Sequence, residues 1–224
     1  MTRDLRLMAV ASTGGAVLNE TLKHPLVRRS VRLLVTDRAC EAEAKAAAHG
    51  VPCRRIAEDD PGRFCAQLLA VCREEQIDYV ISYYTRFYSQ AFRDAYRDRI
   101  VNFHPSLLPA FKGMDGFGDT LAYHARLAGN TVEFIDQVMD EGKIILQTVF
   151  PVDPGVPVES LRHRVFVQQC RALIQVVSWL SQDRIRVRGR EVLVSGARYE
   201  DPEYSPALDV DEARRWTPPA PQEA

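Results

Sequence analysis

Short apolar runs alternate with amphipathic stretches through the first half of the chain. Two of the intervals between these runs have helical patterns: residues 40–49 are rich in alanine and glutamate, and apolar positions recur about every 3.6 residues at 62–76. The apolar runs themselves, each bounded by turn-forming residues, predict strands at residues 5–11, 31–36, 51–56, 78–84 and 99–103. Strands that alternate with helices of this length indicate βαβ units around a mostly parallel sheet with helices on both faces. Such an open sheet usually binds its ligand beyond the carboxyl ends of its strands.

The pattern changes after residue 103. Residues 104–118 are rich in proline and glycine, which predicts a loop. The elements expected after this loop are a short helix at 119–127, strands at 131–136 and 143–152, a long helix at 158–180, and a hairpin formed by residues 185–187 and 192–194. We therefore expect an α/β class, Rossmann-like single domain over residues 1–203. A proline-rich tail at 204–224 is expected to be loose or draped on the surface.

Composition narrows the class of protein. The chain has 224 residues, of which 46% are hydrophobic and 26% are charged, with a formal net charge of -1. That balance argues against a nucleic-acid partner and against an anionic membrane surface. No apolar run approaches the roughly 20 residues that a membrane span needs, and no signal-peptide core follows the first residues. Five scattered cysteines without a C-x-x-C pair predict reduced thiols in a cytoplasmic protein without structural zinc.

A glycine turn follows the first apolar run. Gly14 and Gly15 allow a tight strand-to-helix turn, and the N–H groups at the start of the next helix could face an anion. Ser12 and Thr13 add hydroxyl groups. Because a Walker lysine and the full dinucleotide fingerprint are both missing, a plain turn without a ligand is an equal alternative.

The stronger candidate chemistry lies at the end of the fifth run. Asn102 and His104 are two positions apart on a strand, so their side chains point to the same side. A carboxamide donor and an imidazole at this edge suit a carbonyl group that is polarised and then protonated. Four acids beside the later turn, Glu133, Asp136, Asp140 and Glu141, would ordinarily form a solvated loop. If Asp140 folds back toward His104, it could orient the imidazole.

These segments together resemble the folate-dependent formyltransferase family. The family signature N-[IVF]-H-P-S-L-L-P matches residues 102–109, and T-V-x-F-[VI]-x-x-x-x-D-x-G-x-I-[IL]-x-Q matches residues 131–147. The likeness is strongest to the branch that acts on glycinamide ribonucleotide in purine synthesis. It implies transfer of a formyl group from 10-formyltetrahydrofolate to the primary amine of a small molecule, without a metal. It leaves open whether the protein is a homodimer.

The resemblance also implies roles for individual residues. Asn102 would stabilise the oxyanion, His104 would stabilise the same charge and protonate the departing folate nitrogen, and Asp140 would hold His104 and take the amine proton through water. Donor binding is implied for Arg86, Phe87, Tyr88, Met139, Glu141 and Gly142, although core packing is an equal alternative for Phe87 and Tyr88. Acceptor binding is implied for Ser12, Thr13, Gly14, Gly15 and Gln169.

The departures from the family pattern concern the acceptor. Gly15-Ala16-Val17 stands where Gly-Ser-Asn usually helps to hold a phosphate, Gln169 stands for a glutamate, and Glu133 stands for a frequent histidine. Glu133 is more simply interpreted as a solvated acid. An amino sugar or another specialised amine therefore remains an alternative acceptor. A formyltetrahydrofolate hydrolase and a non-catalytic folate-binding module are further alternatives, weakened by Pro105 and by the complete Asn102, His104 and Asp140 set.

Overall fold

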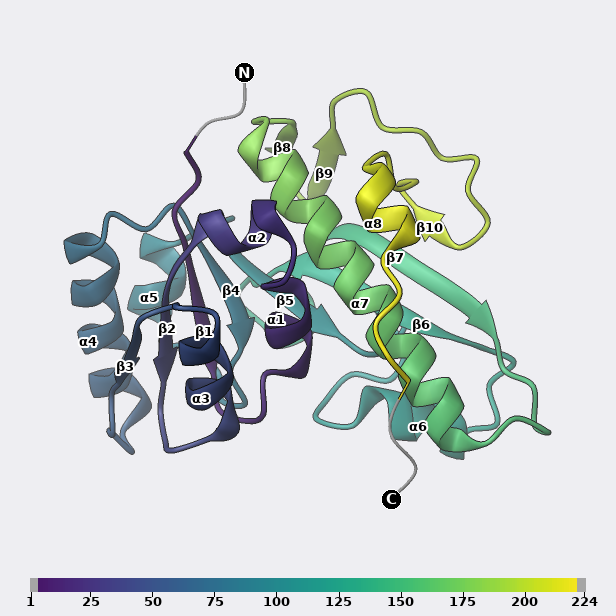
Figure 1. The fold of residues 1–224 in the computed structure, drawn as a ribbon, viewed down its shortest axis with the longest axis horizontal. Helices are drawn as coiled ribbons and strands as arrows, with labels where there is room; N and C mark the ends of the chain where they lie inside the picture. The colour runs from purple at the N-terminus through teal and green to yellow at the C-terminus, as the bar shows by residue number, and fades with distance from the viewer. Residues whose placement is uncertain (1–3, 221–224) are drawn as a thin grey trace.

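The computed structural model describes residues 4–220 and contains an eight-stranded sheet between layers of helices (Figure 1). The sheet order is β10-β7-β6-β5-β4-β1-β2-β3. The strands are β1 (Leu7–Ala11), β2 (Val31–Thr36), β3 (Cys53–Arg55), β4 (Tyr79–Tyr83), β5 (Ile100–His104), β6 (Leu127–Phe134), β7 (Lys143–Pro151) and β10 (Tyr204–Ser205). Strands β1 to β5 are parallel, whereas β6, β7 and β10 pair antiparallel. The predicted α/β class with a mostly parallel sheet is confirmed.

Helices cover both faces of the sheet, as the crossover rule predicts. The helices are α1 (Ala16–Thr21), α2 (Pro25–Ser30), α3 (Glu41–Ala48), α4 (Pro61–Glu74), α5 (Gln90–Ala95), α6 (Gly116–Ala122), α7 (Val158–Ser181) and α8 (Asp211–Arg215). Alternate side chains of β1 pack into two hydrophobic clusters, one on each face of the sheet. Leu7 and Ala9 pack with α1, α2, α3 and α7, and Met8 and Val10 pack with α4 and α5. The strand is therefore buried on both sides and apolar throughout.

The predicted hairpin is present as β8 (Ile185–Arg188) and β9 (Glu191–Val194), apart from the main sheet. The long helix α7 also forms as expected, and every residue from Ala172 to Ser181 is buried. This second half of α7 is buried on all sides and therefore lies in the protein core. Figure 1 shows α7 crossing the molecule between the sheet and the C-terminal segment.

Two predicted boundaries after residue 104 are wrong. Helix α6 begins at Gly116 because the Asp115 side chain accepts a hydrogen bond from the Gly118 N–H and caps it. Strand β6 begins at Leu127 and runs through Gly129, where a break was expected. A Cβ atom on Gly129 would lie 1.8 Å from the Thr148 carbonyl oxygen, so glycine here permits close strand pairing rather than ending the strand.

The C-terminal segment is packed rather than loose as far as the structure describes it. Tyr204 pairs with Thr148 of β7, and Leu208 and Ala213 are 1% and 0% exposed. The Asp209 carboxylate accepts hydrogen bonds from Gln175 and Trp179 of α7. The division at residue 204 remains a prediction, and Pro221 lies outside the described residues.

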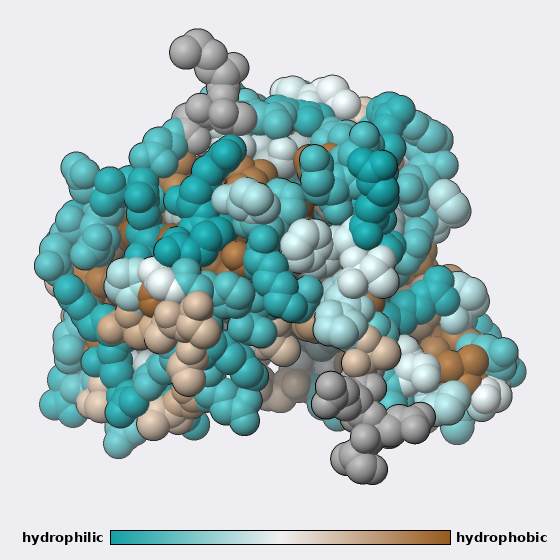
Figure 2. Space-filling model, in the orientation of Figure 1, coloured by the Kyte–Doolittle hydropathy of each residue, from teal (hydrophilic) through white to brown (hydrophobic). Residues whose placement is uncertain are grey.

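The five cysteines are free, and Cys65, Cys72 and Cys170 are buried. Within residues 4–220, no helix is both long enough and apolar enough to cross a bilayer. Figure 2 shows a mainly hydrophilic face that is hollowed at its lower edge, below the carboxyl ends of the parallel strands.

Candidate active site

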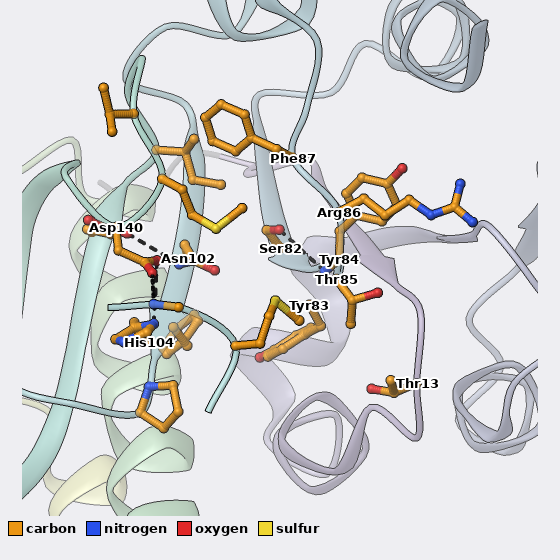
Figure 3. Close-up of a pocket in the computed structure, with 18 residues that line it drawn as sticks. Thr13, Ser82, Tyr83, Tyr84, Thr85, Arg86, Phe87, Asn102, His104 and Asp140 are labelled. Carbon is orange, nitrogen blue, oxygen red and sulfur yellow. Dashed lines mark hydrogen bonds and ion pairs between the residues drawn. The ribbon is translucent and has the colours of Figure 1, made fainter. Parts of the chain in front are cut away.

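A cavity of about 250 Å³ opens at the carboxyl ends of β4 and β5. Three segments line most of it, namely residues 82–87 after β4, residues 102–105 at the end of β5, and residues 138–140 in the turn between β6 and β7. Figure 3 shows Asn102, His104 and Asp140 together on one wall of this cleft. The cleft therefore lies where an open α/β sheet is expected to bind its ligand.

His104 is buried and held from both ring nitrogens. Its Nδ1 lies 3.4 Å from Asp140 Oδ1, and its Nε2 lies 2.9 Å from the carbonyl oxygen of Phe111. Both partners are acceptors when Asp140 is ionised, so the doubly protonated imidazolium satisfies both contacts. This arrangement stabilises a positive charge at the edge of the cleft.

Asp140 folds back to the end of β5, as the sequence analysis hypothesised. Its Oδ2 accepts a hydrogen bond from the Gly113 N–H at 2.7 Å, and its φ is 55°. A positive φ is uncommon in residues other than glycine, although aspartate tolerates it better than most, and such backbone often occurs at functional sites. The carboxylate is thus fixed between the loop after β5 and the imidazole.

The loop after β5 is attached to the antiparallel strands. Thr131 Oγ1 donates to the Ser106 carbonyl at 2.8 Å and accepts from the Leu108 N–H at 3.0 Å. Gln147 Nε2 donates to the Leu108 carbonyl at 2.9 Å. These bonds fix the path that brings the Phe111 carbonyl to His104.

Helix α6 approaches His104 at a glycine. A Cβ atom on Gly116 would lie 2.6 Å from His104 Nε2 and 2.9 Å from the Phe111 carbonyl oxygen. Any larger residue at this position would displace the imidazole or its acceptor. Gly116 is therefore part of the construction of the site, although it carries no side chain.

Asn102 faces Glu133 across the β5/β6 pair. Asn102 Nδ2 lies 3.3 Å from Glu133 Oε1, and Glu133 is 1% exposed. Burial raises the pKa of Glu133 above its ordinary value, and its hydrogen bond with Asn102 opposes that shift. The interpretation of Glu133 as a solvated acid is wrong, because β6 is covered on both faces and buries this side chain.

Only some of the residues expected to bind the folate donor line the cleft. Phe87 and Met139 line the cleft beside Asp140. Arg86 also borders the cleft, but its guanidinium turns away from His104 in Figure 3 and donates to the Asp59 carbonyl at 3.0 Å. The side chain of Tyr88 is not in the cleft, because it is 1% exposed in the core and its hydroxyl donates to Ser82 Oγ. Core packing is the correct reading for that side chain.

Glu141 and Gly142 line a second cavity of about 370 Å³ on the other side of the Asp140 turn. Lys112 and Arg190 also border it, and Lys112 Nζ forms an ion pair with Glu141 at 2.7 Å. Asp140 and Glu133 border both cavities. The carboxylates of Asp140 and Glu133 therefore lie between the two cavities.

The glycine turn after β1 lies across the cleft from His104. Thr13 borders the cleft, whereas Ser12 is buried and its Oγ accepts from the Thr85 N–H at 3.1 Å. Lys45 Nζ lies 3.0 Å from the Gly14 carbonyl oxygen, and Gly15 adopts a φ of 56° as the residue before α1. The Gln169 side chain is half-buried on α7 and is not among the residues that line either cavity.

Sequence reasoning missed several contributors to the site. The Phe111 carbonyl and Gly116 act through backbone positions, which leave no side-chain signal. Three apolar members of the cleft wall were also missed, and these are Met114, Ile135 and Val138. The one available signal was the cross-strand pairing of β5 and β6, which places Glu133 opposite Asn102.

Within the described residues, no group of three or more His, Cys, Asp or Glu side chains is arranged to hold a metal ion. The groups that converge on the cleft are instead a hydrogen-bond donor, an imidazole and two carboxylates. Such a set suits proton transfer and stabilisation of a negative oxygen.

Comparisons with known proteins agree with this chemistry. A phosphoribosylglycinamide formyltransferase from Mycobacterium tuberculosis (strain CDC 1551 / Oshkosh) is 32% identical over 191 residues, which cover 83% of this chain and 89% of that protein. The crystal structure of glycinamide ribonucleotide transformylase 1 from Symbiobacterium toebii superposes with a TM-score of 0.79 at 30% identity, and covers 85% of this chain and 93% of that one.

A formyltetrahydrofolate deformylase from Pseudomonas syringae shares the fold, with a TM-score of 0.75 at 17% identity over 85% of this chain and 66% of that one. The family profile described as formyl transferase matches residues 7–177, which include Asn102, His104 and Asp140. The chain therefore belongs to the formyl transferase family and is a formyltransferase enzyme.

Proposed function

We propose that this enzyme transfers the formyl group of 10-formyltetrahydrofolate to the primary amine of a small acceptor, with glycinamide ribonucleotide as the nearest precedent. The observation that carries the proposal is the convergence of Asn102, His104 and Asp140 on one wall of the cleft. The names of the relatives support the reaction class.

The cleft fits a flat, partly apolar donor with a polar edge. Phe87, Ile135, Val138 and Met139 provide apolar surface next to Asp140. The backbone of the turn that carries Asp140 provides N–H and C=O groups for the polar edge of a pteridine. A pocket that combines apolar surface with oriented polar groups is typical of a small-molecule site.

Asn102 would act on the formyl oxygen. When the amine nitrogen forms its bond to the formyl carbon, the carbonyl electron pair moves to that oxygen. A hydrogen bond from Asn102 Nδ2 would stabilise the negative charge, and a comparable donor in other enzymes is worth about 3–4 kcal/mol.

His104 would stabilise the same charge as an imidazolium and then supply a proton. Collapse of the oxyanion breaks the bond between the formyl carbon and the folate nitrogen, and that nitrogen must gain a proton. The contacts with Asp140 and Phe111 hold the ring in place before transfer. A positioned acid of this kind contributes about 10²–10⁴ in rate.

Asp140 would orient His104 and, through water, take the proton that the attacking amine loses. Its second oxygen is held by the Gly113 N–H, so one oxygen remains beside the imidazole. His104 would give one proton to the folate nitrogen, and Asp140 would take one proton from the amine. Transfer of a proton from Asp140 to His104 would then return the enzyme to its starting state.

An amino sugar or another specialised amine is the second candidate acceptor. The supporting observation is the turn after β1, where Lys45 Nζ is engaged by the Gly14 carbonyl and by Glu41 Oε2 at 2.8 Å. That lysine already has two acceptors, and Gly14, Gly15 and Ala16 offer only backbone N–H groups to a phosphate. A cytoplasmic location remains a prediction from the sequence, which leaves open whether the protein is a homodimer.

Incubation with 10-formyltetrahydrofolate and a panel of amines tests the proposal. Tetrahydrofolate release should require an amine, and the panel comprises glycinamide ribonucleotide, its dephosphorylated form and several amino sugars. Preference for the ribotide over its dephosphorylated form would identify the purine acceptor. Release without any amine would indicate a hydrolase, and no release with any amine would contradict formyl transfer.

A further inference from the structure

Glu133 contacts two segments of the active site at once. Glu133 is directly opposite Asn102 in the antiparallel register of β5 and β6. Its Oε1 accepts a hydrogen bond from Asn102 Nδ2 at 3.3 Å, and its Oε2 accepts one from the Gly142 N–H at 2.9 Å. Gly142 is in the turn that carries Asp140. One carboxylate therefore connects the proposed oxyanion donor with the segment that carries the proposed base.

This carboxylate is buried and forms no ion pair within the part of the chain that the structure describes. Glu133 is 1% exposed, and the ion pairs found among residues 4–220 do not include it. Burial raises its pKa and the charge of Asp140 acts in the same direction, whereas the hydrogen bonds from Asn102 and Gly142 and the charge of His104 act against it. An ionisable group buried at this cost usually has a functional reason.

The turn is built to reach Glu133. A Cβ atom on Gly142 would lie 2.2 Å from the Phe134 carbonyl oxygen and 2.6 Å from Glu133 Oε2. Glycine at this position lets the backbone approach the carboxylate closely enough for a hydrogen bond. The two contacts of Glu133 therefore have separate structural origins, one in strand pairing and one in a glycine turn.

We propose that Glu133 is a positioning residue that fixes the orientation of the Asn102 carboxamide. An ionised carboxylate only accepts hydrogen bonds, so it selects the amide orientation in which Nδ2 faces Oε1. The second N–H of Nδ2 is then available to the formyl oxygen. The inference rests on the proposed function, because Asn102 acts there as a donor.

The orientation depends on the charge of Glu133. A protonated carboxyl can also donate, and it then accommodates the amide oxygen as well as the amide nitrogen. The titratable and charged groups around Glu133 are His104 and Asp140 at the cleft, and Lys112, Glu141 and Arg190 across the second cavity.

The kinetic test is Glu133→Gln. Glutamine has one acceptor oxygen for the two N–H donors, so Asn102 or Gly142 loses its partner. We expect kcat to fall by about tenfold or more, with KM values within about threefold, because positioning acts on the transition state. In an Asn102→Ala background the same change should lower kcat by less than about threefold, since a residue that acts through Asn102 has nothing left to orient. Fully additive losses would overturn the inference.

A matched control is Glu43→Gln on α3, which removes a carboxylate that accepts hydrogen bonds from Thr36 and Arg55. It lies outside both cavities and should leave kcat unchanged. Loss of activity in Glu133→Gln together with an equal loss in Glu43→Gln would indicate general damage and contradict a positioning role.

A spectroscopic test of the same inference does not depend on turnover. The chain has three asparagines, Asn19, Asn102 and Asn130, so isotope labelling of asparagine gives three side-chain amide signals. The signal that disappears in Asn102→Ala should shift with pH in the wild-type protein and stay constant in Glu133→Gln. If the Asn102 signal titrates identically in both proteins, the inference fails. If no amine supports transfer while this shift is present, the proposed function fails and the contact between Glu133 and Asn102 stands.

Discussion

Nδ1 of His104 lies 3.4 Å from Oδ1 of Asp140. His104 is the last residue of β5 and Asp140 is in the turn after β6, so a loop, α6 and β6 separate the two residues along the chain. The distance is longer than an ordinary hydrogen bond and fits an ion pair that can shorten when the imidazole carries charge. The second ring nitrogen is held by a carbonyl, so the ring cannot rotate freely.

Replacement of Asp140 by Asn should separate binding from turnover. The amide keeps the shape of the side chain and removes the charge that stabilises the imidazolium. We expect kcat to fall by about 10²–10⁴, while folate binding changes little. Steady-state kinetics and fluorescence titration with a folate analogue measure the two effects. Equal loss of binding and turnover would contradict the assigned role.

Gly116→Ala tests the approach of α6 to His104. The added methyl group would meet Nε2 at 2.6 Å, so the imidazole must move out of line with Asp140. We expect a loss of kcat of about tenfold or more, because small displacements of reacting groups are costly. Gly155→Ala is the control, because its Cβ would meet only the Asp153 carboxylate oxygen at 3.3 Å. Similar activity of the two variants would show that the contact does not position the ring.

Glu43 should contribute pH-dependent stability away from the site. Hydrogen bonds from Arg55 and then Thr36 lower its pKa from 4.5 to about 2. A lowered folded-state pKa stabilises the protein above the unfolded value, and this contribution is lost as pH falls from 4.5 toward 2. Because the pair is partly exposed, we expect Glu43→Gln to cost about 1 kcal/mol at neutral pH.

Urea unfolding of wild type and Glu43→Gln at several pH values checks this expectation. The difference in unfolding free energy should shrink below pH 4.5 and be mostly lost by about pH 2. A difference that is constant across this range would contradict an ionic origin.

Asp209 should hold the C-terminal segment on α7. Burial alone would raise its pKa, but hydrogen bonds from Trp179, Gln175 and Arg184 lower it overall. Asp209→Ala leaves these donors without an acceptor, so we expect a loss of about 1–3 kcal/mol in the unfolding free energy.

The control for Asp209 is Asp211→Ala. Asp211 is exposed, and its ion pair with Arg214 is 3.9 Å long, so its removal should change stability by about 0.5 kcal/mol or less. Equal effects of the two variants would show that the segment is not anchored at Asp209.

The sequence predicted the parallel half of the sheet and the position of Asn102 and His104 on one side of β5, because strand periodicity is a local property. The contact of Asp140 with His104 could only be hypothesised, since it depends on how β6 returns along β5. The burial of Glu133 could not be predicted, because β6 is covered on both faces and shows no alternation. The packing of Leu208 depends on contacts with α7 that no local pattern reveals.

The central claim is tested most directly by following the formyl group itself. The protein is incubated with a donor that carries an isotopically labelled formyl group, together with glycinamide ribonucleotide or another amine from the panel, and both products are analysed by mass spectrometry. We predict that the label appears on the acceptor nitrogen with the wild-type protein and is strongly reduced with His104→Ala. Label found only in free formate, or transferred equally by both proteins, would contradict the account.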